Sequence, residues 1–184
     1  MDDLSRGIAT SPQIATLRIA VADPLLIDGF LCLDRMDLLG LHQPGLLVTN
    51  HFCAEIYGWL NKDRYRKAIL ARHLLEASIT DPRELETFVR LGIGGRLSPA
   101  EKSAIALALH RGHTLAIEYN NALVKALSEA GIDPHRLVIC HPREILSDLV
   151  RNNGMDERTA RKLRRAWPEE GRRSDQILDG PKIR

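Results

Sequence analysis

The sequence has few aromatic residues, little net charge and no long apolar run. Aromatic residues make up 4% of the 184 residues, which argues against recognition of nucleic-acid bases on an aromatic stacking platform. The formal net charge is only +2, so any contact with nucleic acid must come from a local basic surface. No apolar stretch approaches the roughly 20 residues needed to cross a bilayer. We therefore expect a protein without a membrane partner.

Cysteines are also scarce, and their arrangement bears on the compartment. The three cysteines include no CxxC pair, and their number is odd. Both features favour a reducing environment. The N-terminal segment lacks the basic start and apolar run of a secretory signal. We expect a cytoplasmic location.

Short apolar segments alternate with helical patterns along most of the chain. The expected strands are residues 17–22, 46–49, 113–117 and 137–140. The expected helices cover residues 25–39, 50–59, two stretches within 62–90, 99–111, 120–130 and 142–153. Strands that alternate with helices indicate a parallel sheet with right-handed crossovers. We predict an α/β fold of three layers, α/β/α, with a central parallel sheet of four or five strands.

Composition divides the chain into three parts. Residues 1–15 are small and polar and are expected to be a flexible N-terminus. Residues 16–154 hold the alternating pattern and form the predicted domain. Residues 155–184 begin with a short segment crowded with arginine and lysine and continue as a polar tail. We expect a basic helix followed by a loosely held end.

Four acidic residues occupy comparable places in this pattern. Asp23 follows the first strand, Glu55 lies one helical turn after the second, and Glu118 follows the third. Glu101 lies in the first turn of the helix that precedes the third strand. Ligands of open parallel sheets bind beyond the carboxyl ends of the strands. The four carboxylates are therefore expected to share one rim of the sheet.

Clustered carboxylates need a neutralising partner. Like charges in contact raise each other's pKa or require a cation. Mg²⁺ and Mn²⁺ are hard ions that prefer oxygen ligands, and such an ion would activate water for phosphodiester hydrolysis. We therefore predict Asp23, Glu55, Glu101 and Glu118 as catalytic and metal-binding residues. Thr49 at the end of the second strand is a possible accessory group, as is Asn121.

Each acid also has a structural alternative that the sequence leaves open. Asp23 could cap the helix that follows it. Glu101 could be the second half of a capping box with Ser98. Glu55 and Glu118 could be ordinary solvated residues.

Four segments between residues 17 and 150 resemble the PIN-domain family. Ile19–Asp23 is similar to the family's opening strand with its metal-binding Asp, and Val48–Ile56 is similar to the segment with its conserved Glu. Leu97–Ala108 resembles the stretch where an acid begins an alanine-rich helix. Leu115–Asn121 resembles the strand end that carries the last acid.

The resemblance implies a function. PIN-like proteins are commonly Mg²⁺- or Mn²⁺-dependent endoribonucleases that hydrolyse single-stranded RNA, and many are toxins of toxin–antitoxin pairs. The resemblance thus implies RNA and an antitoxin protein as partners. A second copy of the chain is a further possible partner, because small domains with exposed helical hairpins often form dimers. The family usually has Asp at the last position with another acid nearby, whereas this chain has Glu118, Tyr119 and Asn121. An alternative is therefore a catalytically degenerate PIN-like domain that binds RNA or protein without cutting.

Other signals are weaker. Gly92–Gly95 follows a helical pattern and lacks the dinucleotide-binding fingerprint, which disfavours a Rossmann-like small-molecule enzyme. The basic run of residues 158–165 could contact RNA phosphates or could be a solvated helix face. Basic residues on the middle helices (Arg64, Arg66, Lys67 and Arg72) could line a path for a single strand.

Overall fold

The computed structural model describes residues 18–166 except 43, 57 and 153. The predicted flexible segment 1–15 and the tail after residue 166 lie outside these residues. The strands are β1 (Ile19–Val21), β2 (Leu46–Thr49), β3 (Leu75–Ala77), β4 (Thr114–Ala116) and β5 (Ile139–Cys140). The α-helices are α1 (Pro24–Cys32), α2 (Phe52–Glu55), α3 (Trp59–Leu70), α4 (Pro82–Gly92), α5 (Pro99–Arg111), α6 (Asn121–Glu129), α7 (Pro142–Arg151) and α8 (Glu157–Ala166). Two 3₁₀ helices, η1 (Met36–Leu41) and η2 (Pro134–Arg136), precede β2 and β5.

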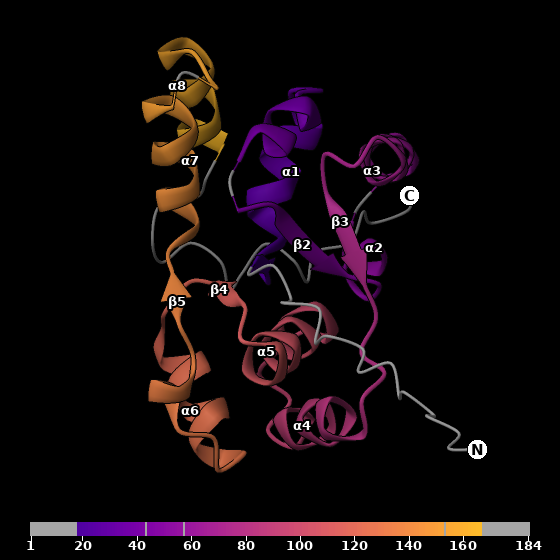
Figure 1. The fold of residues 1–184 in the computed structure, drawn as a ribbon, viewed down its shortest axis with the longest axis vertical. Helices are drawn as coiled ribbons and strands as arrows, with labels where there is room; N and C mark the ends of the chain where they lie inside the picture. The colour runs from indigo at the N-terminus through magenta and orange to yellow at the C-terminus, as the bar shows by residue number, and fades with distance from the viewer. Residues whose placement is uncertain (1–17, 43, 57, 153, 167–184) are drawn as a thin grey trace, which may run out of the picture.

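The sheet has five strands in the order β3-β2-β1-β4-β5, and every pairing is parallel. Helices α1, α3, α7 and α8 lie on one face, and α4, α5 and α6 lie on the other (Figure 1). This arrangement confirms the predicted three-layer α/β/α fold. Within the described part of the chain, no helix is both long enough and apolar enough to span a bilayer.

Alternate residues of the central strands enter separate cores on the two faces. Val21 belongs to the core with α1, α7 and α8, whereas Ala20 and Ala22 belong to the core with α5 and α6. Side chains of successive residues in a strand point to opposite faces, so an interior strand must be apolar throughout. That requirement explains why β1 could be recognised as a short uninterrupted apolar run.

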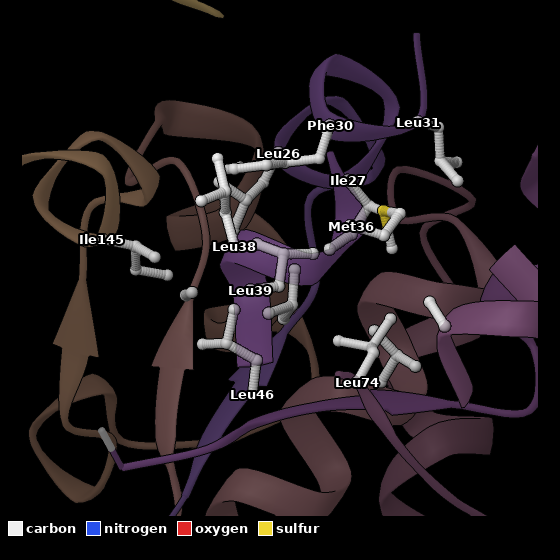
Figure 2. Packing of buried hydrophobic residues seen from close by; sticks show 14 of the residues in the cluster. Leu26, Ile27, Phe30, Leu31, Met36, Leu38, Leu39, Leu46, Leu74 and Ile145 are labelled. Carbon is white, nitrogen blue, oxygen red and sulfur yellow. The ribbon is translucent and has the colours of Figure 1, made fainter. Parts of the chain in front are cut away.

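The core beneath α1 depends on a sharp break after that helix. The sequence pattern predicted one helix over residues 25–39, but α1 ends at Cys32 and η1 begins at Met36. Asp34 lies between them in the left-handed region, with φ of 55°. The break folds η1 back so that Met36 and neighbouring leucines meet the apolar face of α1 (Figure 2). The helical spacing of apolar residues continues over residues 25–39, so it gave no sign of the backbone turn that interrupts the helix.

Two further predictions were wrong in detail. Residues 75–77 were placed in a helical pattern, but they form the edge strand β3, paired with β2. Leu, Glu and Ala are helix-forming residues, and pairing with β2 overrides that preference. The helix predicted over residues 50–59 is only one turn, α2, because Ile56 is extended; Gly58 then adopts a positive φ of 80°, and α3 begins at Trp59.

The connections between strands indicate which edge of the sheet is the candidate for ligand binding. The connections that follow β1 and β2 pass over one face of the sheet, and those that follow β3 and β4 pass over the other. The direction therefore changes between the neighbours β1 and β4. Ligands of open α/β sheets bind at such a switch point, beyond the carboxyl ends of the strands.

Candidate functional site

Asp23 and Glu118 flank the switch point on neighbouring strands. Val21 is aligned with Ala116, so each acid lies two residues beyond the last aligned pair of β1 and β4. The backbone N–H of Ala22 donates to the carbonyl of Ala116 at 3.0 Å, which extends the pairing toward both acids. Asp23 is buried, with 3% of its surface exposed, and Glu118 is partly exposed. The structure thus places both residues at the predicted rim.

Glu55 contacts α5, a helix on the opposite face of the sheet from α1. Its Oε1 accepts a hydrogen bond of 2.7 Å from the backbone N–H of Ala100. Ala100 is in the first turn of α5, whose N–H groups have no partner within the helix. The positive end of the helix dipole also favours a carboxylate at this position. The bond therefore gives Glu55 a structural function at the N-terminus of α5.

Glu101 forms the capping box that was its structural alternative. Its backbone N–H donates to Ser98 Oγ at 3.2 Å, and its Oε2 accepts from the backbone N–H of Ser98 at 2.8 Å. Glu55 and Glu101 therefore each accept a backbone N–H at the start of α5, although they are 46 residues apart in the chain. Both carboxylates contribute to the first turn of α5.

Thr49 ties the end of β2 to the same helix. Its Oγ1 lies 2.6 Å from Ser103 Oγ, and both residues are buried. Ser103 donates its only hydroxyl proton toward the carbonyls of Pro99 and Ala100, so Thr49 is the donor in the pair. Thr49 therefore positions α5 against the sheet.

Asn121, the other predicted accessory residue, is exposed at the start of α6. The capping contact there comes from its neighbour: Asn120 Oδ1 accepts from the backbone N–H of Leu123 at 3.0 Å. Nothing in the described contacts joins Asn121 to the four acids.

Asp28 is the residue that sequence reasoning missed. It lies in α1, within the otherwise apolar sequence PLLIDGFLC. Its Oδ1 is buried and has no hydrogen-bond partner among the described residues. Burial raises the pKa of Asp28 above its ordinary value, and the nearby charge of Asp23 raises it further. A lone acid inside an apolar helix was the signal that could have identified it.

The carboxylates do not assemble into the complete four-ligand centre that was predicted. Among the residues described by the structure, no three His, Cys, Asp or Glu side chains are grouped so as to hold a metal ion. A magnesium ion, however, is commonly held by one or two carboxylates and keeps several waters. Asp23 and Asp28 are candidates for that smaller requirement, because Asp28 Oδ1 is buried without a hydrogen-bond partner among the described residues and the charge of Asp23 raises the pKa of Asp28.

A cavity of about 410 Å³ lies elsewhere, between η1 and α3. Its charged lining residues pair with one another: Arg64 with Asp34 at 3.2 Å, and Lys67 with Asp63 at 2.8 Å. Arg64 also donates to the carbonyl of Leu31 at 2.7 Å. Two of the basic residues proposed to line an RNA path are thus engaged within the protein. The cavity is a weaker candidate than the rim with Asp23.

No protein-family model, curated protein or solved structure matches this chain. The candidate site therefore depends on its own geometry and on the motif resemblance alone.

Proposed function

We propose that this chain is a PIN-like, metal-dependent endoribonuclease that cuts single-stranded RNA at the switch point of its sheet. The observation that supports it best is the buried Asp23 at the end of β1, with Glu118 at the matching position after β4 and an Asp28 oxygen, unpartnered among the described residues, in the helix that follows Asp23. Burial and the charge of Asp23 raise the pKa of Asp28, and a bound cation would offset the cost of its ionised form. A strand end at a topological switch point is also where ligands approach such folds.

In this proposal Asp23 and Asp28 hold the ion, and Glu118 borders the crevice. A bound Mg²⁺ or Mn²⁺ would supply an acidified water and would stabilise negative charge on the phosphate. Burial of Asp23 excludes water from one side of its carboxylate. Glu55, Glu101 and Thr49 hold the N-terminal part of α5 at the same rim through hydrogen bonds.

The partners proposed are those that the resemblance implies. They are RNA as substrate and an antitoxin protein that blocks the enzyme. A second copy of the chain is proposed as well, because small domains with exposed helical hairpins often form dimers. The proposed location is the cytoplasm, where unpaired cysteines remain reduced.

The deciding experiment is RNA cleavage by the full chain with millimolar Mn²⁺ or Mg²⁺. Asp23→Asn removes the charge and keeps the shape, and we expect a loss of about 10²-fold or more if the ion is essential. Asp37→Asn is the matched control, because Asp37 is an exposed partner of Arg35 in η1. Equal cleavage by the wild type and Asp23→Asn contradicts the proposal.

A second candidate is a PIN-like module that binds RNA or protein without cutting. It is favoured by the engagement of Glu55 and Glu101 at α5 and by the missing group of three ligands in the described chain. Calorimetry separates the two candidates. The absence of any heat of Mn²⁺ binding at millimolar metal, together with unchanged RNA binding in Asp23→Asn, supports the module.

A further inference from the structure

Helix α8 combines a buried apolar side with an exposed basic side. Five of its ten residues, ERTARKLRRA, are basic. Ala160 and Leu163 are fully buried in the core shared with α1 and α7. Arg158, Arg161 and Lys162 are exposed and are spaced i, i+3 and i+4, so they share one helix face. We call these three residues the α8 basic face.

Helix α8 has a defined position against α1 and a capped N-terminus. Leu163 Cδ2 lies 3.1 Å from the place where a Cβ on Gly29 would be, so α8 is in close contact with α1. At its start, Asp156 accepts from both the backbone N–H and the hydroxyl of Thr159, at 2.9 and 2.7 Å. The helix is capped and packed, which gives the α8 basic face a defined position.

Among the residues that the structure describes, no acid forms an ion pair with the α8 basic face. Ion pairs with nearby acids engage Arg35, Lys67, Arg83, Arg96, Arg111 and Arg151. Like charges at these spacings destabilise a helix by about 0.2–0.5 kcal/mol for each pair. Within the described part of the chain, the three charges therefore repel one another without a compensating acid, and a phosphate backbone would supply the missing negative charge.

Helix α8 packs against α1, the helix that begins directly after Asp23. Gly29, which contacts Leu163, follows Asp23 by six residues, or about 9 Å along the helix axis. The carboxylates at the rim repel a phosphate backbone, and the net charge of the chain is only +2. A strand of RNA at the rim therefore needs a basic surface close by.

We infer that the α8 basic face binds the phosphate backbone of single-stranded RNA and directs it toward the switch point. This inference depends on the proposed function for the class of its ligand. The chemistry favours nucleic acid over a membrane surface, because binding to a bilayer needs an exposed apolar face and that side of α8 is buried. The scarcity of aromatic residues also favours backbone contacts over base stacking.

The test is the salt dependence of RNA binding by the full chain. The probe is a fluorescein-labelled oligouridylate of about 20 nucleotides, longer than a typical single-strand binding site, and the buffer contains EDTA so that no cleavage occurs. Each phosphate contact on a single strand contributes about 0.7 to the slope of log K against log salt. Arg158→Ala/Arg161→Ala/Lys162→Ala should therefore lower the slope by about 2 and weaken binding at low salt about tenfold or more.

Two controls separate charge from fold. Arg83→Ala/Lys125→Ala/Arg136→Ala removes the same charge from exposed residues of α4, α6 and η2 and should leave the slope unchanged. Arg158→Lys/Arg161→Lys keeps the charge and should preserve the slope. Circular dichroism of each variant should match that of the wild type, because all the changed side chains are exposed.

An unchanged slope in the triple α8 variant overturns the inference, whether or not the protein cleaves RNA. So does a wild-type chain that ignores the RNA but binds polyglutamate through this face, a result that indicates an acidic protein partner. The failure of the nuclease proposal looks different: cleavage is absent while the salt-dependent binding through the α8 basic face remains.

Discussion

Glu55 Oε1 and the backbone N–H of Ala100 are joined by a 2.7 Å hydrogen bond between residues 45 positions apart. This bond connects the short helix after β2 to the start of α5. It makes Glu55 a cap for a helix that belongs to a different part of the chain. It also means that a loss of activity after removal of Glu55 does not by itself identify a metal ligand.

Paired substitutions at Glu55 separate the two roles. Glu55→Ala leaves the Ala100 N–H without its acceptor and should lower the free energy of unfolding by about 1–2 kcal/mol. Glu55→Gln keeps an acceptor oxygen and should cost less than half as much. If Glu55 takes part in the chemistry, both variants lose RNA cleavage. Full cleavage by Glu55→Gln, with urea unfolding near that of the wild type, assigns Glu55 to the cap alone.

The Thr49–Ser103 contact predicts an asymmetric pair of substitutions. Thr49 donates to Ser103, and Ser103 donates to backbone carbonyls. Ser103→Ala leaves the buried Thr49 hydroxyl without its acceptor and should cost about 1–3 kcal/mol. Thr49→Val removes only a donor and should cost about 0.5–1.5 kcal/mol. Urea unfolding of both variants and of the double variant measures the coupling, and a larger loss in Thr49→Val contradicts this assignment of the donor.

Sequence patterns identified the parts of the rim that depend on local chemistry. The apolar run of β1 followed by Asp23 and Pro24 marks a strand end and a helix start. The capping box of α5 was also readable, because Ser98 and Glu101 have the required spacing.

What the sequence could not reveal depends on contacts between distant segments. The edge strand β3 is three residues of helix-forming character held by β2, and its pairing is a tertiary effect. The Glu55–Ala100 bond has no local signature for the same reason. Asp28 is different, since an acid within an apolar helix was visible, but its proximity to Asp23 follows only from the turn into α1.

Asp28 should make stability depend on pH in an unusual direction. Burial, with the added charge of Asp23, raises the pKa of Asp28 above 3.8, so the folded protein binds this proton more tightly than the unfolded chain. The stability contributed by the protonated group is present below the unfolded pKa and is lost as pH rises through the folded value. Asp28→Asn should therefore gain stability relative to the wild type as pH rises above about 4.

Urea unfolding between pH 3 and pH 8 measures this difference, with Asp37→Asn as the exposed control. Millimolar Mn²⁺ at pH 7 should raise the thermal midpoint of the wild type and should have less effect on Asp28→Asn, because a bound cation stabilises the folded state. A difference between wild type and Asp28→Asn that is independent of pH contradicts the buried-acid assignment. Equal Mn²⁺ stabilisation of both proteins excludes Asp28 as a ligand.

The ion pair between Glu84 and Arg111 holds the C-terminal end of α5. It should make stability depend on pH in the direction opposite to that expected for Asp28. Glu84 is 2% exposed, and its two oxygens accept from Arg111 Nε and a terminal nitrogen at 2.6 and 2.9 Å. Burial raises the pKa of Glu84, but Arg111 and two backbone N–H groups outweigh it and bring the value below 4.5. Its contribution to stability is thus present above the unfolded pKa and is lost as pH falls through the folded value.

Arg111→Met should lower the free energy of unfolding at pH 7 by about 2–4 kcal/mol, because it leaves a buried carboxylate without its cation while water still reaches the site of the partly exposed Arg111. The loss should shrink at acidic pH, because without Arg111 burial favours the protonated form of Glu84. Arg83→Met, which removes an exposed partner of Asp81, should change stability much less, because solvent screens an exposed ion pair. The other end of α5 carries the contacts of Glu55 and Thr49, so Arg111→Met also tests whether the rim depends on the whole helix. RNA cleavage by this variant should fall as its stability falls. Cleavage should recover under conditions in which the variant is folded. Cleavage that stays low in fully folded Arg111→Met contradicts a purely structural role for the pair.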